Sequence, residues 1–149
     1  MCIRDRVSTY LNFQGNTAEA FEFYRAAFGT EYVGTLMRMG DMPGHADHLS
    51  EAERQMIMHI ELPILGGHVL MATDFIESMG HILQPGNNVS LNLEPDTLEE
   101  AQRLHAALSE GADDVTPLQQ MPWGAWWSSF IDRFGTRWMF NVPVSPDPS

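Results

Sequence analysis

The sequence predicts an α+β fold in which one βαβββ module occurs twice. The first observation is an internal repeat, since L-N-F at positions 11–13 followed by Thr17 recurs as L-N-L at positions 91–93 followed by Thr97. The second is that each copy combines an alternating strand pattern, a polar turn and an amphipathic helix. The third is the length of 149 residues, which suits one ordinary domain. The two modules would therefore share one core.

The first module is expected to contain one helix and four strands. Residues 18–28 carry apolar side chains at helical spacing, and Gly29 follows where a C-terminal cap belongs. Alternating side-chain character predicts strands at residues 8–13, 31–39, 55–62 and 68–73. Residues 40–53 are rich in Gly, Pro, His and acidic residues, and they are expected to form a loop.

The second module repeats this order. Asp96 or Thr97 is expected to cap a helix over residues 98–109, and Gly111 is expected to stop it. Strands are predicted at residues 88–94, 115–118, 126–132 and 136–142. Asp132 precedes a Phe-Gly turn and is expected to brace a hairpin.

The domain is expected to comprise residues 7–142, with modules at 7–80 and 88–142. Residues 1–6 resemble the translation of a transposon-end adaptor used in sequencing libraries, so we expect a non-native leader. Residues 143–149 are Pro-rich and are expected to form a flexible tail. No apolar run is long enough to span a bilayer, and Cys2 is the only cysteine, so we expect a cytoplasmic protein without disulfides.

The charge and the glycine pattern exclude several classes of partner. With 8 basic and 20 acidic residues, the formal net charge is −12. Nucleic-acid binding depends on Lys and Arg, so DNA and RNA are poor candidates, and no membrane partner is expected. The sequence lacks the glycine-rich turns that bind nucleotides or S-adenosylmethionine, and therefore no cofactor is expected.

Four motifs connect the chain to a known family. They are A-F-E-F-Y-R-A-A-F-G at 20–29, M-H-I-E-L at 58–62, L-M-A-T-D at 70–74 and W-G-A-W-W-S-S-F-I-D-R-F-G-T-R-W-M-F-N at 123–141. With them the chain resembles the PhnB-like branch, often labelled 3-demethylubiquinone methyltransferase-like, of the vicinal oxygen chelate superfamily, which has the glyoxalase and bleomycin-resistance fold. The resemblance implies a curved mixed sheet with a covering helix in each module, two sheets facing each other around a cleft, and a homodimer.

The resemblance also implies positions for a metal site. Superfamily enzymes typically hold a divalent metal with His or Glu from the first and fourth strand of each module. Carried onto this chain, those positions are Ser8 or Thr9, Met71, Ser90 and Met139. Neutral hydroxyls and thioethers are weak ligands for the ions that such a site uses. We therefore expect no standard metal centre.

His59 and Glu61 are the candidate catalytic residues. On the predicted third strand they share one face with Ile57, about 6–7 Å apart, where a carboxylate and an imidazole could act as base and acid. The alternative is a pair of partly exposed residues at the edge of the sheet.

The candidate ligand-binding residues come from the fourth strand of each module and the aromatic stretch near the carboxyl end. They are Met71, Trp126, Ser128, Met139 and Asn141. Tryptophan rings can stack on a planar ligand, or equally fill the core or a dimer interface. The Asn141 amide either braces the structure or addresses a ligand.

The loop at residues 44–51 contains His45, Asp47, His48 and Glu51. These are zinc-binding residue types, but their spacing does not place them on one face of a helix. We expect a solvated loop.

The leading hypothesis is a small-molecule binding protein that holds an apolar or aromatic metabolite or antibiotic in its cleft. The alternative is a lyase, isomerase or dioxygenase that uses a relocated metal or a His59 and Glu61 acid–base pair. A third hypothesis is a structural or regulatory partner whose cleft is filled by its own side chains.

Overall fold

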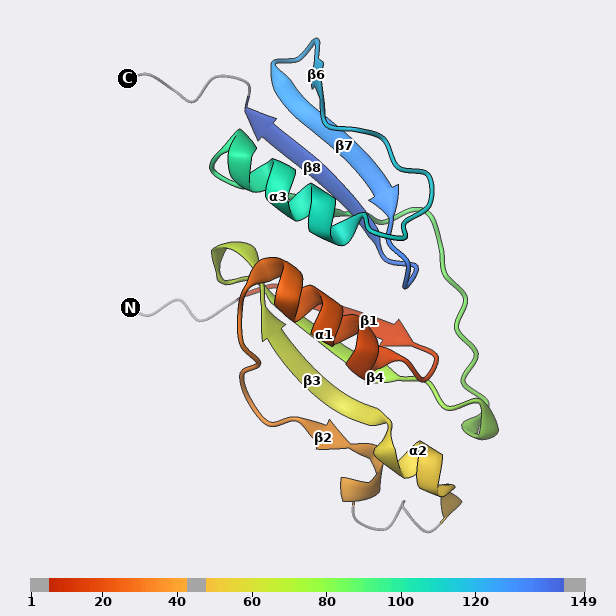
Figure 1. Cartoon of the computed structure of the whole chain (residues 1–149). Helices are drawn as coiled ribbons and strands as arrows, with labels where there is room; N and C mark the ends of the chain where they lie inside the picture. The colour runs from red at the N-terminus through yellow and green to blue at the C-terminus, as the bar shows by residue number, and fades with distance from the viewer. Residues whose placement is uncertain (1–5, 43–47, 144–149) are drawn as a thin grey trace. The chain divides into compact units, whose positions relative to one another are not determined.

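The computed structural model describes residues 6–42 and 48–143. The chain divides into two compact units, Met1–Gln84 and Pro85–Ser149, and each is described by itself (Figure 1). The expected leader lies outside the described residues except for Arg6, and the expected tail except for Pro143. The cleft that the resemblance implies between the modules stays a prediction.

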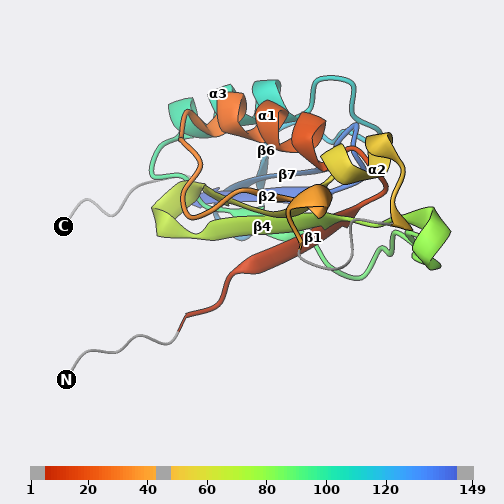
Figure 2. The same cartoon turned by 90° about the horizontal axis from the view of Figure 1, so that it is seen from below.

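The first unit is a four-stranded mixed sheet with one covering helix. Its strand order is β1-β4-β3-β2, with β1 and β4 parallel and the other pairs antiparallel. The bounds are β1 (Thr9–Phe13), β2 (Met37–Arg38), β3 (Ile57–Pro63), β4 (Val69–Asp74) and α1 (Thr17–Phe28). Figure 2 shows α1 on one side of this sheet. The ring of Phe21 packs edge-on against Phe13 at 6.3 Å between ring centroids, which closes the core between helix and sheet.

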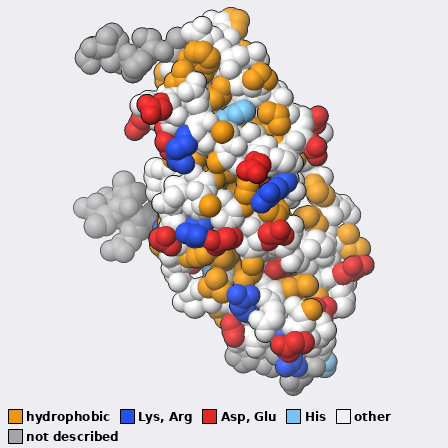
Figure 3. Space-filling view, viewed as in Figure 1, with side chains coloured by type: hydrophobic (Ala, Val, Ile, Leu, Met, Phe, Trp, Pro, Cys, Tyr) orange, Lys and Arg blue, Asp and Glu red, His pale blue; other side chains and the backbone are white. Residues whose placement is uncertain are grey.

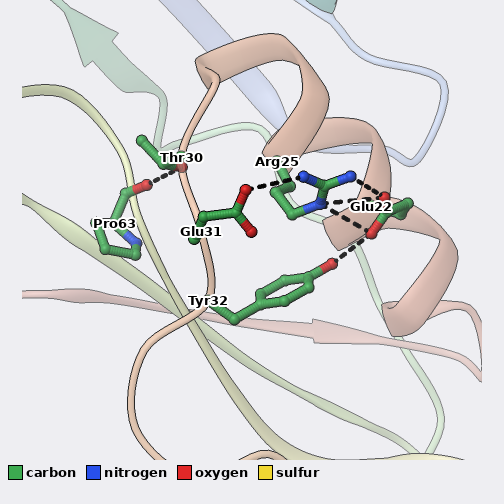
Figure 4. A network of polar contacts seen from close by, with 6 residues as sticks. All are labelled: Glu22, Arg25, Thr30, Glu31, Tyr32 and Pro63. Carbon is green, nitrogen blue, oxygen red and sulfur yellow. Dashed lines mark hydrogen bonds and ion pairs between the residues drawn. The ribbon is translucent and has the colours of Figure 1, made fainter.

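Both ends of α1 are held by side chains. At its start, Asp74 Oδ1 accepts hydrogen bonds from the amide and the hydroxyl of Thr17 at 2.9 and 2.6 Å. A carboxylate at this end satisfies free N–H groups and complements the helix dipole. At its far end, Gly29 adopts the left-handed conformation of a C-cap, with φ 68°. Arg25 bridges Glu22 and Glu31 there, and Tyr32 donates to Glu22 (Figure 4).

The second unit has the same topology. Its strand order is β5-β8-β7-β6, again with the first pair parallel and the others antiparallel. The bounds are β5 (Leu91–Leu93), β6 (Gln119–Met121), β7 (Ala125–Ile131), β8 (Arg137–Pro143) and α3 (Leu98–Leu108). The Thr97 hydroxyl caps α3 by accepting from the Glu100 amide at 3.1 Å. The predicted α+β class and the repeated module are confirmed.

Trp138 lies at the centre of the second core. Its side chain is fully buried, and its indole Nε1 donates to Asp132 Oδ2 at 2.8 Å. Asp132 Oδ1 accepts from the amides of Phe134 and Thr136, so the predicted hairpin role of Asp132 is confirmed. His105 of α3 contacts Phe130 with ring centroids 5.3 Å apart, which identifies the helix-covered face of this sheet.

Three predicted elements differ from the structure. The second strand is two residues long rather than nine, because Gly34 turns the chain with a φ of 69°. Pro117 lacks an amide hydrogen, and the β6 strand begins only after it. The expected loop at 40–53 contains the 3₁₀ turn Met39–Asp41 and the start of α2 (Glu51–Gln55), with reciprocal hydrogen bonds between Ser50 and Glu53 at its start.

Two further 3₁₀ turns are Leu65–Gly67 and Glu77–Met79. Within the described residues, no helix is both long enough and apolar enough to cross a bilayer.

Candidate functional site

We call the face of each sheet opposite its helix the helix-free face. In the first unit, Phe13 and Asp74 contact α1. Strand alternation therefore places the residue next to each of them, and every second residue from there, on the helix-free face. The strand pairing then gives two rows across the sheet, which contain Tyr10, Asn12, Met37, His59, Glu61, Met71 and Thr73. Met71 lies directly between Tyr10 on β1 and Glu61 on β3.

Three side chains on this face form a hydrogen-bonded chain. His59 Nε2 lies 3.2 Å from Glu61 Oε2, and His59 Nδ1 lies 3.3 Å from the Tyr10 hydroxyl. The side chains of His59 and Glu61 are 28% and 21% exposed, so they are partly shielded but still reachable from solvent. The structure thus brings the two predicted catalytic candidates together and adds Tyr10.

The hydrogen bonds favour one tautomer of the neutral His59 imidazole. A carboxylate only accepts, so Nε2–H of His59 donates to Glu61 and leaves the Nδ1 lone pair to accept from the Tyr10 hydroxyl. Burial raises the pKa of Tyr10, which keeps its phenol protonated. Tyr10 is therefore suited to donate a hydrogen bond or a proton, rather than to act as a phenolate base.

The segment before β2 crosses close to Glu61. The Val33 amide donates to the Glu61 carbonyl at 3.1 Å. A Cβ atom placed on Gly34 would lie 2.5 Å from Glu61 Oε2, and Gly34 has a φ of +69°. Only glycine fits this backbone beside the carboxylate without displacing it.

In the first unit, the positions that the resemblance assigns to metal ligands carry neutral side chains that contact neighbouring residues. Ser8 Oγ lies 4.0 Å from Met71 Sδ, and Thr9 Oγ1 lies 2.8 Å from His68 Nε2. A hydroxyl and a thioether in mutual contact are a poor donor set for a hard or borderline divalent ion. The residues at these positions therefore do not fit the metal centre of the superfamily.

In the second unit the structure separates the predicted ligand-binding residues. Met139 and Asn141 lie on the helix-free face, opposite Ser129 and Trp127 of β7. Ser128 pairs with Phe140, which contacts His105 of α3, so Ser128 and Trp126 lie on the helix-covered face. Ser128 is fully buried, and its Oγ has no hydrogen-bond partner among the described residues. Ser128 is therefore not positioned to meet a ligand on the face that carries Met139.

The two methionines occupy different registers within the repeat. Met71 is opposite Tyr10, whereas Met139 is opposite Asn92. The repeat L-N-F and L-N-L aligns Asn12 with Asn92. Asn12 is opposite Thr73, so the counterpart of Met139 in this alignment is Thr73 rather than Met71. The fourth strands are thus offset by two residues relative to the first strands, although both methionines stay on the helix-free faces.

Asn141 also lines a pocket within the second unit. The pocket has a volume of about 520 Å³ and is bordered by Glu94, Pro95, Asp96, Trp123, Gly124, Ala125, Asn141 and Pro143. Trp123 is 62% exposed, and Asn141 Oδ1 is buried without a hydrogen-bond partner among the described residues. A volume of this size lies within the range of small-molecule sites.

The candidate zinc-type loop is only partly described. His45 and Asp47 lie outside the described residues, while His48 is exposed and Glu51 begins α2. Among residues 6–42 and 48–143, no three His, Cys, Asp or Glu side chains are grouped so that they could hold a metal ion.

Several residues of these faces were not predicted from the sequence. Tyr10 lies on the same face as Met71 in the first unit. In the second unit, Trp127 lies beside Asn141, and Arg137 lies on the face of Met139. Strict alternation from Phe13 and from Trp138, both buried, would have identified them. Alternation does not hold at the start of β3. Ile57 is buried, whereas His59 and Glu61 are half-buried, so Ile57 does not share their environment as predicted. The pairing of β2 with β3 shifts register at this point.

No family model matches the sequence. Protein PA1353 from Pseudomonas aeruginosa is 33% identical in a structural match that covers 93% of this chain and 98% of that protein, with a TM-score of 0.78. A PhnB protein from Bacillus cereus matches at 22% identity over 93% and 99% of the two chains, with a TM-score of 0.73. Protein YjdN of Escherichia coli K12 is 25% identical over 143 residues, which is 91% of this chain and 94% of that protein.

A more distant likeness concerns metal binding. A variant of the fosfomycin resistance protein FosX from Listeria monocytogenes, in complex with Mn(II) and 1S,2S-dihydroxypropylphosphonic acid, is 14% identical. The match covers 95% of this chain and 94% of that protein, with a TM-score of 0.59. This likeness shows the fold alone.

Proposed function

Because this chain belongs to the PhnB-like branch of the vicinal oxygen chelate superfamily, we propose that it is a small-molecule binding protein without the superfamily's standard metal centre. Its ligand is an apolar or aromatic metabolite or antibiotic that lies against the helix-free face of a sheet. The main support for this proposal is the contact between Ser8 and Met71. These two residues stand at positions where the superfamily has metal ligands, and a hydroxyl and a thioether bind such ions weakly.

The chemistry of the two faces supports an apolar ligand. Met71 and Met139 are half-buried rather than packed into a core, and Trp127 is half-buried beside Asn141. Thioethers adapt their shape to apolar ligands, and an indole offers a stacking surface with an N–H donor. The pocket at Asn141 and Trp123 would add a polar anchor next to a ring.

Metal analysis tests the first half of the proposal. Protein purified without chelator should contain nickel, zinc and manganese far below one equivalent. Stoichiometric binding of any of the three would defeat the claim that the centre is missing, because weak donors do not retain these ions through purification.

Binding of Nile red, an uncharged apolar dye, tests the second half. Met71→Glu and Met139→Glu should each weaken binding, because they place a charge on an apolar contact surface. Ile82→Glu is the control, since Ile82 is 66% exposed and lies outside both sheets. Equal binding by all three variants would contradict a site on the helix-free faces.

One observation favours an enzyme as the second candidate. The Tyr10, His59 and Glu61 chain has the elements of an acid–base relay, with a carboxylate that orients an imidazole and a phenol at its outer end. A lyase or isomerase that moves a proton on its substrate could use this relay without a metal. Loss of turnover in both His59→Gln and Tyr10→Phe would support this candidate, while unchanged turnover in His59→Gln would exclude the relay.

We also propose that the protein is a homodimer, the assembly that the family resemblance implies. Light scattering coupled to size-exclusion chromatography should give twice the chain mass of 16.8 kDa. A mass of one chain at micromolar concentration would contradict it.

A further inference from the structure

Arg137 lies on the helix-free face of the second sheet. It is the first residue of β8, and alternation places it on the same face as Met139 and opposite Ile131 of β7. Its side chain is half-buried, and Nε is buried with no hydrogen-bond partner among the described residues. A buried donor without an acceptor is costly. The remaining N–H groups of this half-buried guanidinium are not buried, so they can meet a partner from outside the chain.

Four of the other arginines in the described ranges differ from Arg137, because their guanidinium groups have acceptors. Arg25 pairs with Glu22 and Glu31, and Arg103 pairs with Glu100. Arg38 and Arg54 donate to the carbonyl oxygens of Gln55 and Leu49. On the face that Figure 3 shows, basic and acidic side chains are interspersed. No ion pair of Arg137 exists among the residues that the structure describes.

The strand residues that share the helix-free face with Arg137 include no carboxylate, although the chain has 20 acidic residues. The strand residues on this helix-free face are Asn92, Gln119, Met121, Ala125, Trp127, Ser129, Ile131, Met139, Asn141 and Pro143. None of them is acidic. Asp113 pairs with Ile131 on the side of β7 away from Arg137. Asp113 and Arg137 form no ion pair.

We propose that Arg137 binds an anionic group, a carboxylate or a phosphate, on the ligand. This inference rests on the proposed binding function and adds the charge of the ligand to it. Met139 lies two residues further along β8, about 6–7 Å away, so the apolar part of the same molecule would rest on its thioether. A guanidinium suits this role because it stays charged and offers several N–H groups to a planar oxyanion.

A series of benzoate, phenyl phosphate, benzamide and benzylamine tests the proposal at constant ionic strength. The four share one ring but differ in charge, and the methyl signal of Met139, assigned with Met139→Leu, reports binding by NMR. Benzoate and phenyl phosphate should bind the wild-type protein about tenfold more tightly than benzamide, and benzylamine should bind most weakly.

Arg137→Gln should reduce benzoate affinity to the level of benzamide and leave benzamide itself unchanged. Arg137→Lys should restore part of the difference, because the charge returns without the planar donor set. Arg133→Gln is the control, since Arg133 lies over the Phe134 ring in the hairpin at 5.2 Å. Circular dichroism checks that each variant is folded.

The outcomes separate this inference from the proposed function. If benzamide binds and benzoate binds no better, the anion site is excluded while the binding function stands. If no member of the series binds, both are excluded. If Arg137→Gln alters the oligomeric state and leaves the preference for benzoate intact, a residue of another copy satisfies Arg137, and the inference is overturned.

Discussion

Glu61 Oε2 lies 3.2 Å from His59 Nε2, so two side chains from one face of β3 form a hydrogen-bonded pair. On the other side of the imidazole, the Tyr10 hydroxyl lies 3.3 Å from Nδ1. The pair and the phenol come from β3 and β1, which are separated by β4, so the sheet itself assembles the chain of three.

We expect neutral His59 to carry its proton on Nε2. Glu61 accepts from this position, and Tyr10 donates to the other nitrogen. Nitrogen-15 NMR at alkaline pH distinguishes the two tautomers, and Glu61→Leu with Tyr10→Phe should reduce the preference. His68 is the internal control, since its partner is Thr9. A predominant Nδ1–H tautomer in the wild-type protein would contradict the arrangement.

Gly34→Ala should destabilise the protein more than Gly29→Ala. The two glycines have nearly equal φ values of +69° and +68°, so both substitutions incur a left-handed backbone cost of about 1–2 kcal/mol. Only at Gly34 would the new Cβ meet Glu61, at 2.5 Å from Oε2, so the carboxylate must move and its hydrogen bond to His59 is disturbed, which adds about 1 kcal/mol. Urea unfolding measures both free energies.

A double mutant separates the two costs. In the Glu61→Ala background, Gly34→Ala should cost only as much as Gly29→Ala, because the obstructing carboxylate is gone. If the unfolding free-energy changes of Gly34→Ala and Glu61→Ala simply added in the double mutant, the segment around Gly34 would be able to move away from Glu61.

Asp74→Asn should lower the free energy of unfolding by about 2–3 kcal/mol. Both carboxylate oxygens of Asp74 accept hydrogen bonds, from Thr17 at 2.9 and 2.6 Å and from the Ile57 amide at 2.7 Å. An amide group has one acceptor oxygen, so its NH₂ would face a donor in a site that is 3% exposed. Glu110→Gln at an exposed position is the control and should change stability little. Equal stability of Asp74→Asn and wild type would refute the capping role.

The sequence predicted the fold well where periodicity was strong. The apolar stripe over residues 18–28 indicated one buried face of a helix, and Ala20, Phe21, Tyr24, Ala27 and Phe28 of α1 are buried. The prediction of β2 failed because alternation over residues 31–39 does not reveal that Gly34 adopts a left-handed conformation. Backbone turns of this kind depend on tertiary contacts, here with Glu61.

The candidate site was predicted less completely for a similar reason. His59 and Glu61 were found because they are neighbours on one strand, whereas Tyr10 joins them only through the order of strands in the sheet. Trp126 and Trp127 are adjacent in sequence, and only the pairing of Trp127 with Asn141 decides which ring lies on the helix-free face. A shift of one residue exchanges the faces of a strand, so register matters more than composition here.

The Tyr32 phenol gives a pH dependence that can be measured. Burial, together with its hydrogen bond to Glu22 at 2.9 Å, raises the pKa of Tyr32 from 10.0 to about 12 (Figure 4). The folded state therefore holds this proton more tightly than the unfolded chain does. The resulting stabilisation is fully present below pH 10 and is lost as the pH rises from 10.0 through about 12.

Ultraviolet absorbance of tyrosinate follows this titration, and the difference between wild type and Tyr32→Phe isolates Tyr32. Glu22→Gln should lower the pKa of Tyr32 without returning it to 10.0, because the burial of the ring is unchanged and burial is the larger cause. Tyr10 provides the comparison, since burial alone raises its pKa and Glu22 is not its partner. If Glu22→Gln left the Tyr32 titration unchanged, the hydrogen bond that links α1 to the following segment would be absent in solution.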